Sequence, residues 1–203
     1  MNRKEYFANE EINIPDVKDL SPVSAYTSRP IEWFKDTILG DFVSHLSETK
    51  DVLDVGCAYG YYTVLFTPFC KTVTGIDFTK KRIEAAQNHW KEDNIKFVEQ
   101  DLTIPFTLDK QYDVLFTSMV IQHIPIVGKI AAFKNLATVT KKDGLFIMYD
   151  FKFNNVTDDF VGPINPDWIH NNVGNLWECE SCVSFCREAN NQGEIFKYVL
   201  RRL

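Results

Sequence analysis

Val52-Leu53-Asp54-Val55-Gly56-Cys57-Ala58-Tyr59-Gly60 is the most informative stretch of this chain. Apolar residues run up to an acidic residue, and a turn with two glycines then opens onto the apolar residues 61–66. This order is typical of a buried strand that ends in a tight loop and starts a helix. Because glycine carries no side chain, the backbone at Gly56 and Gly60 can lie against a flat, charged ligand.

Strand and helix signals alternate from residue 51 onward. Short apolar runs and helical spacing predict strands over 51–55, 72–76, 95–98, 112–117 and 144–149, and helices near 60–67, 79–92 and 127–139. An earlier helix should begin near Pro30 and continue through apolar residues at helical spacing as far as Leu46. Repeated strand–helix units predict a parallel sheet with helices on both faces and right-handed crossovers.

The C-terminal part of the chain has a different pattern. Residues 151–177 hold Gly162-Pro163, Pro166 and Gly174, which argue against long regular elements. Residues 178–187 and 194–202 resemble two strands joined by a turn. The expected fold class is therefore α/β, with one doubly wound, mostly parallel seven-stranded sheet, a C-terminal antiparallel hairpin and helices on both faces.

The length of 203 residues suits one domain with a substantial core. The expected divisions are N-terminal lid helices over 1–48, a ligand-binding core over 50–150, and a substrate-side segment with the terminal hairpin over 151–203.

Charge and composition exclude several classes of function. The net charge of -6 removes the usual electrostatic signature of a nucleic-acid-binding protein, and we expect the basic run Lys80-Lys81-Arg82 to be solvated surface. No stretch approaches 18 apolar residues, so no membrane span is expected. Without an apolar signal region at the N-terminus, the expected location is the cytoplasm, where the five cysteines would be reduced thiols.

Acidic residues end two further predicted strands. Asp77 closes the second strand, 21 positions after Gly56, where a carboxylate can accept hydrogen bonds from both ribose hydroxyls of a nucleoside. A helix cap is the alternative role, and the two are compatible. Asp101 follows the third strand, where a dinucleotide-binding fold needs no acid. The turn at 56–60 also lacks the G-x-G-x-x-G spacing of a dinucleotide site.

Five motifs in this order resemble those of the class I S-adenosylmethionine-dependent methyltransferases that act on small molecules. The resemblance covers roughly residues 50–150, and the ordered set is far more specific than any one motif. The matching segments are 52–60, Gly75-Ile76-Asp77, Gln100-Asp101-Leu102, 112–118 and 142–148.

The resemblance implies a role for each matching residue. Gly56, Ala58 and Gly60 would pass the methionine part of S-adenosyl-L-methionine, with Asp54 near its amino group. Asp77 would hold the ribose and Asp101 the adenine amino group. The other implied contacts are Leu102 at the adenine edge, Thr117 and Ser118 near the methyl donor, and Arg29 at the cofactor carboxylate, where a surface arginine is the alternative.

Ala58 departs from the family, which usually has glycine at this position. If the backbone there needs a positive φ, alanine costs about 1 kcal/mol or more. This difference motivates the alternative of a cofactor-binding or regulatory subunit without catalysis.

Two residues are candidates for acid–base chemistry or substrate binding. His123 follows the fourth strand, near the expected methyl position, and has a suitable pKa range for a general base, with packing or a cofactor-pocket role as the alternative. Asp150 ends the fifth predicted strand and either binds a substrate hydroxyl or amine or caps a following turn. The methyl acceptor itself is expected to contact segments 1–35 and 151–178, where Trp33, Trp168, His170 and Trp177 are candidates beside simple core packing.

No metal is expected. Cys179, Cys182 and Cys186 fall in one predicted strand, where 182 and 186 would share a face and 179 would point to the other, a poor geometry for a tetrahedral site.

The favoured function is methyl transfer to a small polar acceptor such as a sugar or another metabolite, with oxygen preferred over nitrogen. The alternatives are the non-catalytic subunit, an N-methyltransferase of a small molecule or protein, a nucleic-acid methyltransferase and a nicotinamide-dependent enzyme. The absence of G-x-G-x-x-G opposes the last. Acidic charge and the residues Thr117-Ser118-Met119-Val120 after the fourth strand oppose a nucleic-acid substrate.

Overall fold

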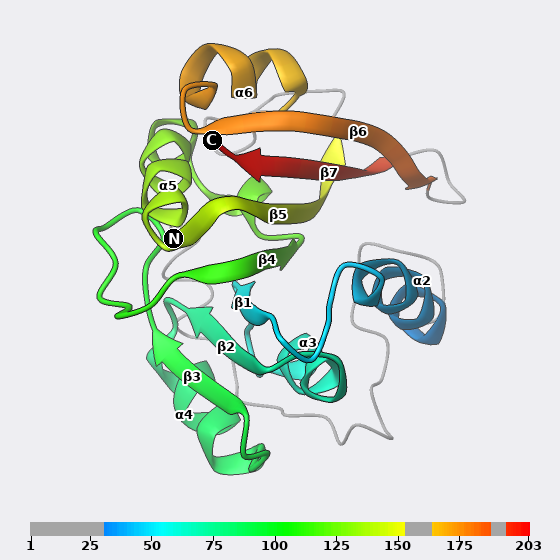
Figure 1. The fold of residues 1–203 in the computed structure, drawn as a ribbon, viewed down its shortest axis with the longest axis vertical. Helices are drawn as coiled ribbons and strands as arrows, with labels where there is room; N and C mark the ends of the chain where they lie inside the picture. The colour runs from blue at the N-terminus through cyan, green and yellow to red at the C-terminus, as the bar shows by residue number, and fades with distance from the viewer. Residues whose placement is uncertain (1–30, 153–163, 188–193) are drawn as a thin grey trace.

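A computed structural model of the chain describes residues 31–152, 164–187 and 194–203. Arg29 therefore lies outside the described residues. Seven strands form one sheet in the order β3-β2-β1-β4-β5-β7-β6 (Figure 1). The strands are β1 (Asp51–Val55), β2 (Thr72–Asp77), β3 (Ile95–Glu99), β4 (Tyr112–Ser118), β5 (Thr140–Lys152), β6 (Trp177–Arg187) and β7 (Glu194–Arg202).

Strands β1 to β5 run parallel, and β7 pairs antiparallel with both β5 and β6. This arrangement confirms the predicted mostly parallel sheet with a C-terminal antiparallel hairpin. The chain moves outward from β1 through β2 to β3 and then returns to place β4 on the other side of β1. Sheets of this kind bind ligands beyond the carboxyl ends of their strands, where the strand order reverses.

Helices cover both faces of the sheet, as predicted. The helices are α2 (Ile31–Val43), α3 (Tyr61–Phe66), α4 (Lys80–His89), α5 (Ile126–Thr138) and α6 (Pro166–Val173), with 3₁₀ turns η1 (Thr67–Phe69) and η2 (Ile121–His123). Figure 1 shows α5 on one side of the strands and α2 with α3 on the other.

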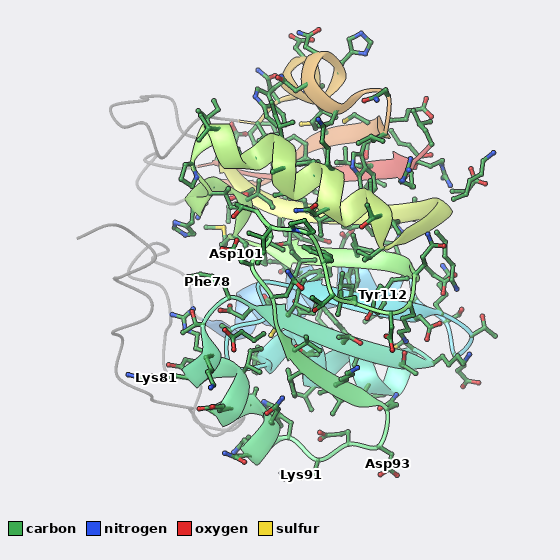
Figure 2. The ribbon with its side chains drawn as sticks, turned by 90° about the vertical axis from the view of Figure 1, so that its left-hand side faces the viewer. Phe78, Lys81, Lys91, Asp93, Asp101 and Tyr112 are labelled. Carbon is green, nitrogen blue, oxygen red and sulfur yellow. The ribbon has the colours of Figure 1, made fainter. Side chains whose placement is uncertain are left out.

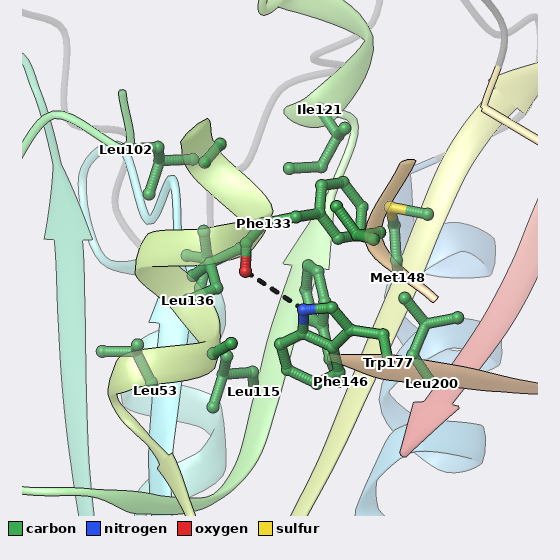
Figure 3. Packing of buried hydrophobic residues seen from close by; sticks show 14 of the residues in the cluster. Leu53, Leu102, Leu115, Ile121, Phe133, Leu136, Phe146, Met148, Trp177 and Leu200 are labelled. Atoms are coloured by element: carbon green, nitrogen blue, oxygen red, sulfur yellow. Dashed lines mark hydrogen bonds between the residues drawn. The ribbon is translucent and has the colours of Figure 1, made fainter. Parts of the chain in front are cut away.

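Two apolar clusters hold these layers together. Ile38 and Phe42 of α2 pack with Phe66 of α3 against Phe116 on one face of the sheet. On the other face, α5 and α6 pack against β4, β5 and β7, and the indole of Trp177 lies in the middle of this cluster (Figure 3).

Trp177 is 1% exposed, and its indole nitrogen donates to the backbone oxygen of Phe133 at 3.0 Å. The buried polar edge of the ring is thereby satisfied, and the ring serves the core. Of the two roles that the sequence allowed for Trp177, the structure therefore favours packing in the core.

The structure adds one helix that the composition had obscured. Pro166, expected as a break, occupies the first turn of α6, where a missing N–H costs nothing. The side-chain oxygen of Asn165 accepts from Trp168 N at 2.7 Å and caps the helix. Proline here begins a short helix instead of interrupting one.

The prediction about the faces of Cys179 and Cys182 was wrong. Strand β6 has a register shift between Cys179 and Ser181, so Cys179 pairs with Leu200 and Cys182 with Tyr198. Leu200 and Tyr198 are two positions apart on β7 and share one face. The β-bulge inserts one extra residue and brings both cysteines to the same apolar cluster.

Candidate functional site at the carboxyl edge of the sheet

The turn after β1 is held by the neighbouring strand. The backbone N–H groups of Gly56 and Cys57 both donate to the carbonyl oxygen of Ile76, at 2.8 and 2.9 Å. Gly56, Ala58 and Gly60 all have positive φ, of 76°, 49° and 80°. Ala58 therefore adopts the left-handed backbone whose cost the sequence analysis considered. In this conformation a residue with a side chain loses about 1–2 kcal/mol of stability.

Neighbouring side chains fill the space that side chains at the two glycines would need. A Cβ at Gly56 would lie 2.4 Å from Val120 Cγ2, and one at Gly60 would lie 2.5 Å from the ring of Phe97. Glycine is thus required by backbone conformation and by close packing together. The sequence analysis related these glycines to a ligand, and it did not predict that Val120 and Phe97 pack against them.

Asp77 ties the glycine turn to the end of β2. Its Oδ2 accepts from Ala58 N at 3.1 Å and its Oδ1 accepts from Thr79 N at 2.8 Å. The side chain is 5% exposed. A carboxylate offers about four acceptor positions, so these two bonds orient the group and leave acceptor capacity for hydroxyl donors.

Asp101 lies beside the end of β2, as the parallel register requires. Gln100 N donates to Asp77 O at 2.9 Å, and Asp101 Oδ1 accepts from both the backbone N–H and the hydroxyl of Thr103. Figure 2 shows Asp101 and Phe78 close together at this edge, with Tyr112 at the opposite end of the strands. Leu102 is 8% exposed and belongs to the core cluster under α5.

Phe78 is a candidate that the sequence reasoning missed. It follows Asp77 directly, is half-buried, and lies in the view of Figure 2 toward the same edge of the sheet as Asp101. A half-buried ring directly after Asp77 offers a flat apolar surface to an aromatic ligand. Its position immediately after the acid of β2 was the signal that could have identified it.

Asp54 is the most deeply buried carboxyl of the site. It is 2% exposed, and its Oδ2 accepts from the hydroxyl of Thr63 at 2.6 Å. Burial raises the pKa of Asp54 to about 7, and the nearby charge of Asp77 acts in the same direction. Burial and the same two carboxylates also raise the pKa of the Cys57 thiol well above its usual range, so this cysteine stays protonated.

Thr117 is enclosed within the sheet. It has no exposed area, and its hydroxyl donates to Val55 O at 2.8 Å, which joins β4 to β1. Ser118, the last residue of β4, is half-buried, and Met119 then takes a φ of 60° while its N–H donates to Tyr149 O at 2.8 Å. The chain turns sharply at this point, over the ends of β4 and β5.

Asp150 and His123 meet through a residue that the sequence did not single out. Asp150 Oδ2 accepts from Gln122 N at 2.9 Å, and the Gln122 side-chain nitrogen lies 3.2 Å from His123 Nε2. Asp150 therefore accepts from the 3₁₀ turn η2, which precedes it in the chain, and both roles predicted for it stay predictions. No sequence pattern marks Gln122, because the contact depends on the fold.

Two of the remaining acceptor candidates lie on α6. Trp168 packs against Phe133, with ring centroids 5.7 Å apart, while His170 is exposed on α6. The side chain of Trp33 lies outside the described part of the chain. The predicted acceptor surface therefore stays a prediction.

In the described part of the chain, no group of three or more histidine, cysteine or acidic side chains is arranged to hold a metal ion. Within the same residues, no helix is long and apolar enough to span a membrane. Lys80 and Lys81 are exposed, in line with a solvated basic run at the start of α4.

Comparison with known proteins agrees with this arrangement. The family model of a methyltransferase domain matches residues 53–148. The uncharacterized methyltransferase YcgJ of Bacillus subtilis is 30% identical over 120 residues, which cover 56% of this chain and 46% of that protein. The ubiquinone biosynthesis O-methyltransferase of Pelagibacter ubique is 28% identical over 149 residues, 69% of this chain and 59% of that protein.

A solved structure has a similar fold. The N-methyltransferase NodS from Bradyrhizobium japonicum, crystallised with S-adenosyl-L-homocysteine, matches with a TM-score of 0.71 at 17% identity, covering 100% of this chain and 99% of that one. By contrast, the chain spans about half the length of the curated relatives it matches. Residues 53–148 therefore match the family model of a methyltransferase domain, and the chain shares the fold of the N-methyltransferase NodS.

Proposed function

We propose that this chain binds S-adenosyl-L-methionine at the carboxyl edge of its sheet and transfers the methyl group to a small polar acceptor. The observation that carries the proposal is the placement of Asp54, Asp77 and Asp101 at the ends of three adjacent parallel strands, beside the glycine turn. Carboxylates so placed suit a ligand that carries an ammonium group, ribose hydroxyls and an adenine amino group.

The carboxylate oxygens of the site are hydrogen-bond acceptors, and they match the hydroxyl and amino donors of this ligand. Asp77 would accept from the ribose hydroxyls, and Asp101 from the adenine amino group, with Phe78 and Leu102 beside the base. The turn through Gly56, Ala58 and Gly60 would face the methionine part. Ser118 and the enclosed Thr117 would lie near the methyl group, at the end of β4. Arg29 would bind the carboxylate of the cofactor.

When bound, S-adenosyl-L-methionine supplies a methyl group on a positively charged sulfur that leaves as a neutral thioether. The protein then needs to align the acceptor, exclude water and accommodate the proton that the acceptor loses. We infer an oxygen acceptor because His123, beside the end of β4, offers a ring that can act on a hydroxyl. Residues 1–203 would act as one domain.

Calorimetry followed by a transfer assay tests this function. The whole chain is titrated with S-adenosyl-L-methionine and S-adenosyl-L-homocysteine, and then incubated with a panel of sugars, phenols and amines, with the methylated atom identified by NMR. Binding with methylation of a hydroxyl supports the proposal. Binding without transfer to any member would favour the non-catalytic subunit, and methylated amines would favour the N-methyltransferase. If the chain bound NAD but neither S-adenosyl-L-methionine nor S-adenosyl-L-homocysteine, the proposed function would be rejected.

Asp77→Ala should weaken binding of S-adenosyl-L-homocysteine by roughly 1–3 kcal/mol, because charged hydrogen bonds to the ribose are lost. Calorimetry measures the change in affinity. Asp93→Ala removes the same charge from an exposed turn and should leave the affinity unchanged. An Asp77→Ala protein that remains folded and binds with wild-type affinity would contradict the ribose assignment.

His123→Ala should lower turnover about a hundredfold, the size of effect typical of a side chain that acts directly on a reacting group. The affinity for S-adenosyl-L-homocysteine should stay unchanged, because His123 is assigned to the acceptor. Steady-state kinetics and calorimetry on the same preparation separate the two effects. A normal rate would assign His123 to packing.

A further inference from the structure

Polar contacts link one residue of β5 to two residues of the turn η2. Asp150, near the end of β5, accepts from the backbone N–H of Gln122, and the side-chain nitrogen of Gln122 lies 3.2 Å from Nε2 of His123. Asp150 and Gln122 are 5% and 7% exposed, whereas His123 is half-buried. Two buried polar groups therefore support the half-buried ring of His123.

The backbone around these contacts is held on both sides. Met119 N donates to Tyr149 O at 2.8 Å, and His123 N donates to Val120 O at 2.9 Å. Val120 fills the space beside Gly56, so the turn that carries Gln122 and His123 also packs against the glycine turn. A group fixed by burial and by backbone bonds can hold a neighbouring side chain in one orientation.

The chemistry of the amide determines which histidine nitrogen carries a proton. A side-chain amide nitrogen only donates hydrogen bonds, so the ring nitrogen facing it must accept one. An imidazole that accepts at Nε2 is neutral and carries its proton on Nδ1. The opposite amide orientation would present oxygen and favour a proton on Nε2.

We propose that Gln122, held by Asp150, is a positioning residue that keeps His123 neutral with its proton on Nδ1. The lone pair on Nε2, the nitrogen that would accept a proton in this tautomer, is then occupied by the Gln122 amide. For the proposed methyl transfer, on which this step rests, His123 acts as a hydrogen-bond donor that orients the acceptor. The acceptor oxygen forms the new bond to the methyl carbon, the carbon–sulfur bond breaks with its electron pair on sulfur, and the acceptor proton leaves to water.

Nitrogen-15 NMR of the histidine rings tests the tautomer without any need for activity. The chain has four histidines, and the His123 signals are those lost in His123→Asn. We expect a protonated Nδ1 and an unprotonated Nε2 at neutral pH in the wild-type protein. A proton on Nε2, or free exchange between both nitrogens, would overturn the proposal.

Two glutamate substitutions sharpen this measurement. Gln122→Glu replaces the donating amide by an accepting carboxylate of the same shape, so the ring should acquire a proton on Nε2. Gln111→Glu makes the same change at an exposed site beside the opposite end of β4 and should leave the His123 signals unchanged. Unchanged signals in a folded Gln122→Glu protein would overturn the proposal, and the wild-type spectrum decides it if that variant does not fold.

A pair of substitutions at His123 tests the consequence for catalysis. The amide nitrogen of asparagine can take the place of a protonated Nδ1 but cannot act as a base. His123→Asn should therefore keep turnover within about tenfold of wild type, whereas His123→Ala loses about a hundredfold. Equal losses in both variants would assign a base and overturn the donor role. If the wild-type protein transfers no methyl group, the proposed function fails, while the NMR experiment still decides the role of Gln122.

Discussion

Asp54→Asn should remove the contribution of this carboxyl to the pH dependence of stability between about pH 4 and pH 7. The carboxyl has a folded-state pKa of about 7 and an ordinary value of 3.8, so the folded protein keeps this proton longer than the unfolded chain does. Stability is therefore fully present at low pH and is lost as the pH rises through this window. The loss is at most about 4 kcal/mol by the linkage relation.

The asparagine side chain has no proton to lose and retains an oxygen that can accept from Thr63. Urea unfolding at pH 4.5, 6 and 8 should show a falling free energy of unfolding in the wild-type protein and a nearly constant contribution at this site in the variant. Asp93→Asn, in an exposed turn, is the matched control and should follow the wild-type curve. Parallel curves for wild type and Asp54→Asn would show that Asp54 titrates at an ordinary pKa.

Gly56→Ala should destabilise the folded protein by about 2–5 kcal/mol. The φ of 76° costs an L-residue about 1–2 kcal/mol, and forcing a methyl group into occupied space adds about 1–3 kcal/mol. The added Cβ would lie 2.4 Å from Val120 Cγ2, and a β-branched side chain has few other rotamers available. Chemical denaturation measures the loss.

A double mutant separates the two causes. Val120→Ala in the Gly56→Ala background removes the clash but not the backbone strain, so it should restore part of the lost stability. Gly40→Ala is the control, because a Cβ at this exposed helical position meets nothing within 4 Å and should stabilise by about 0.5–1 kcal/mol. A Gly56→Ala protein as stable as wild type would mean that the turn does not need its left-handed backbone.

The strands that carry the acids were predictable because their signals are local. Apolar runs that end at Asp54, Asp77 and Asp101 predicted both the parallel sheet and the edge at which these residues meet. Helix ends were less accurate, as for α4, which ends at His89 and not at residue 92. The first strand of the terminal hairpin was also predicted. The bulge between Cys179 and Ser181 was not predicted, because it arises from pairing with β7, and it puts Cys179 and Cys182 on one face.

The sequence by itself determined the order of strands and helices, the glycine turn and the acidic residues at three strand ends, because spacing and turn chemistry act over a few neighbouring residues. Only the tertiary structure decided what those residues touch. Val120 fills the space beside Gly56, and Asp150 reaches Gln122, 28 positions earlier in the chain. Such contacts join segments that meet only when the sheet has assembled, so no local pattern encodes them.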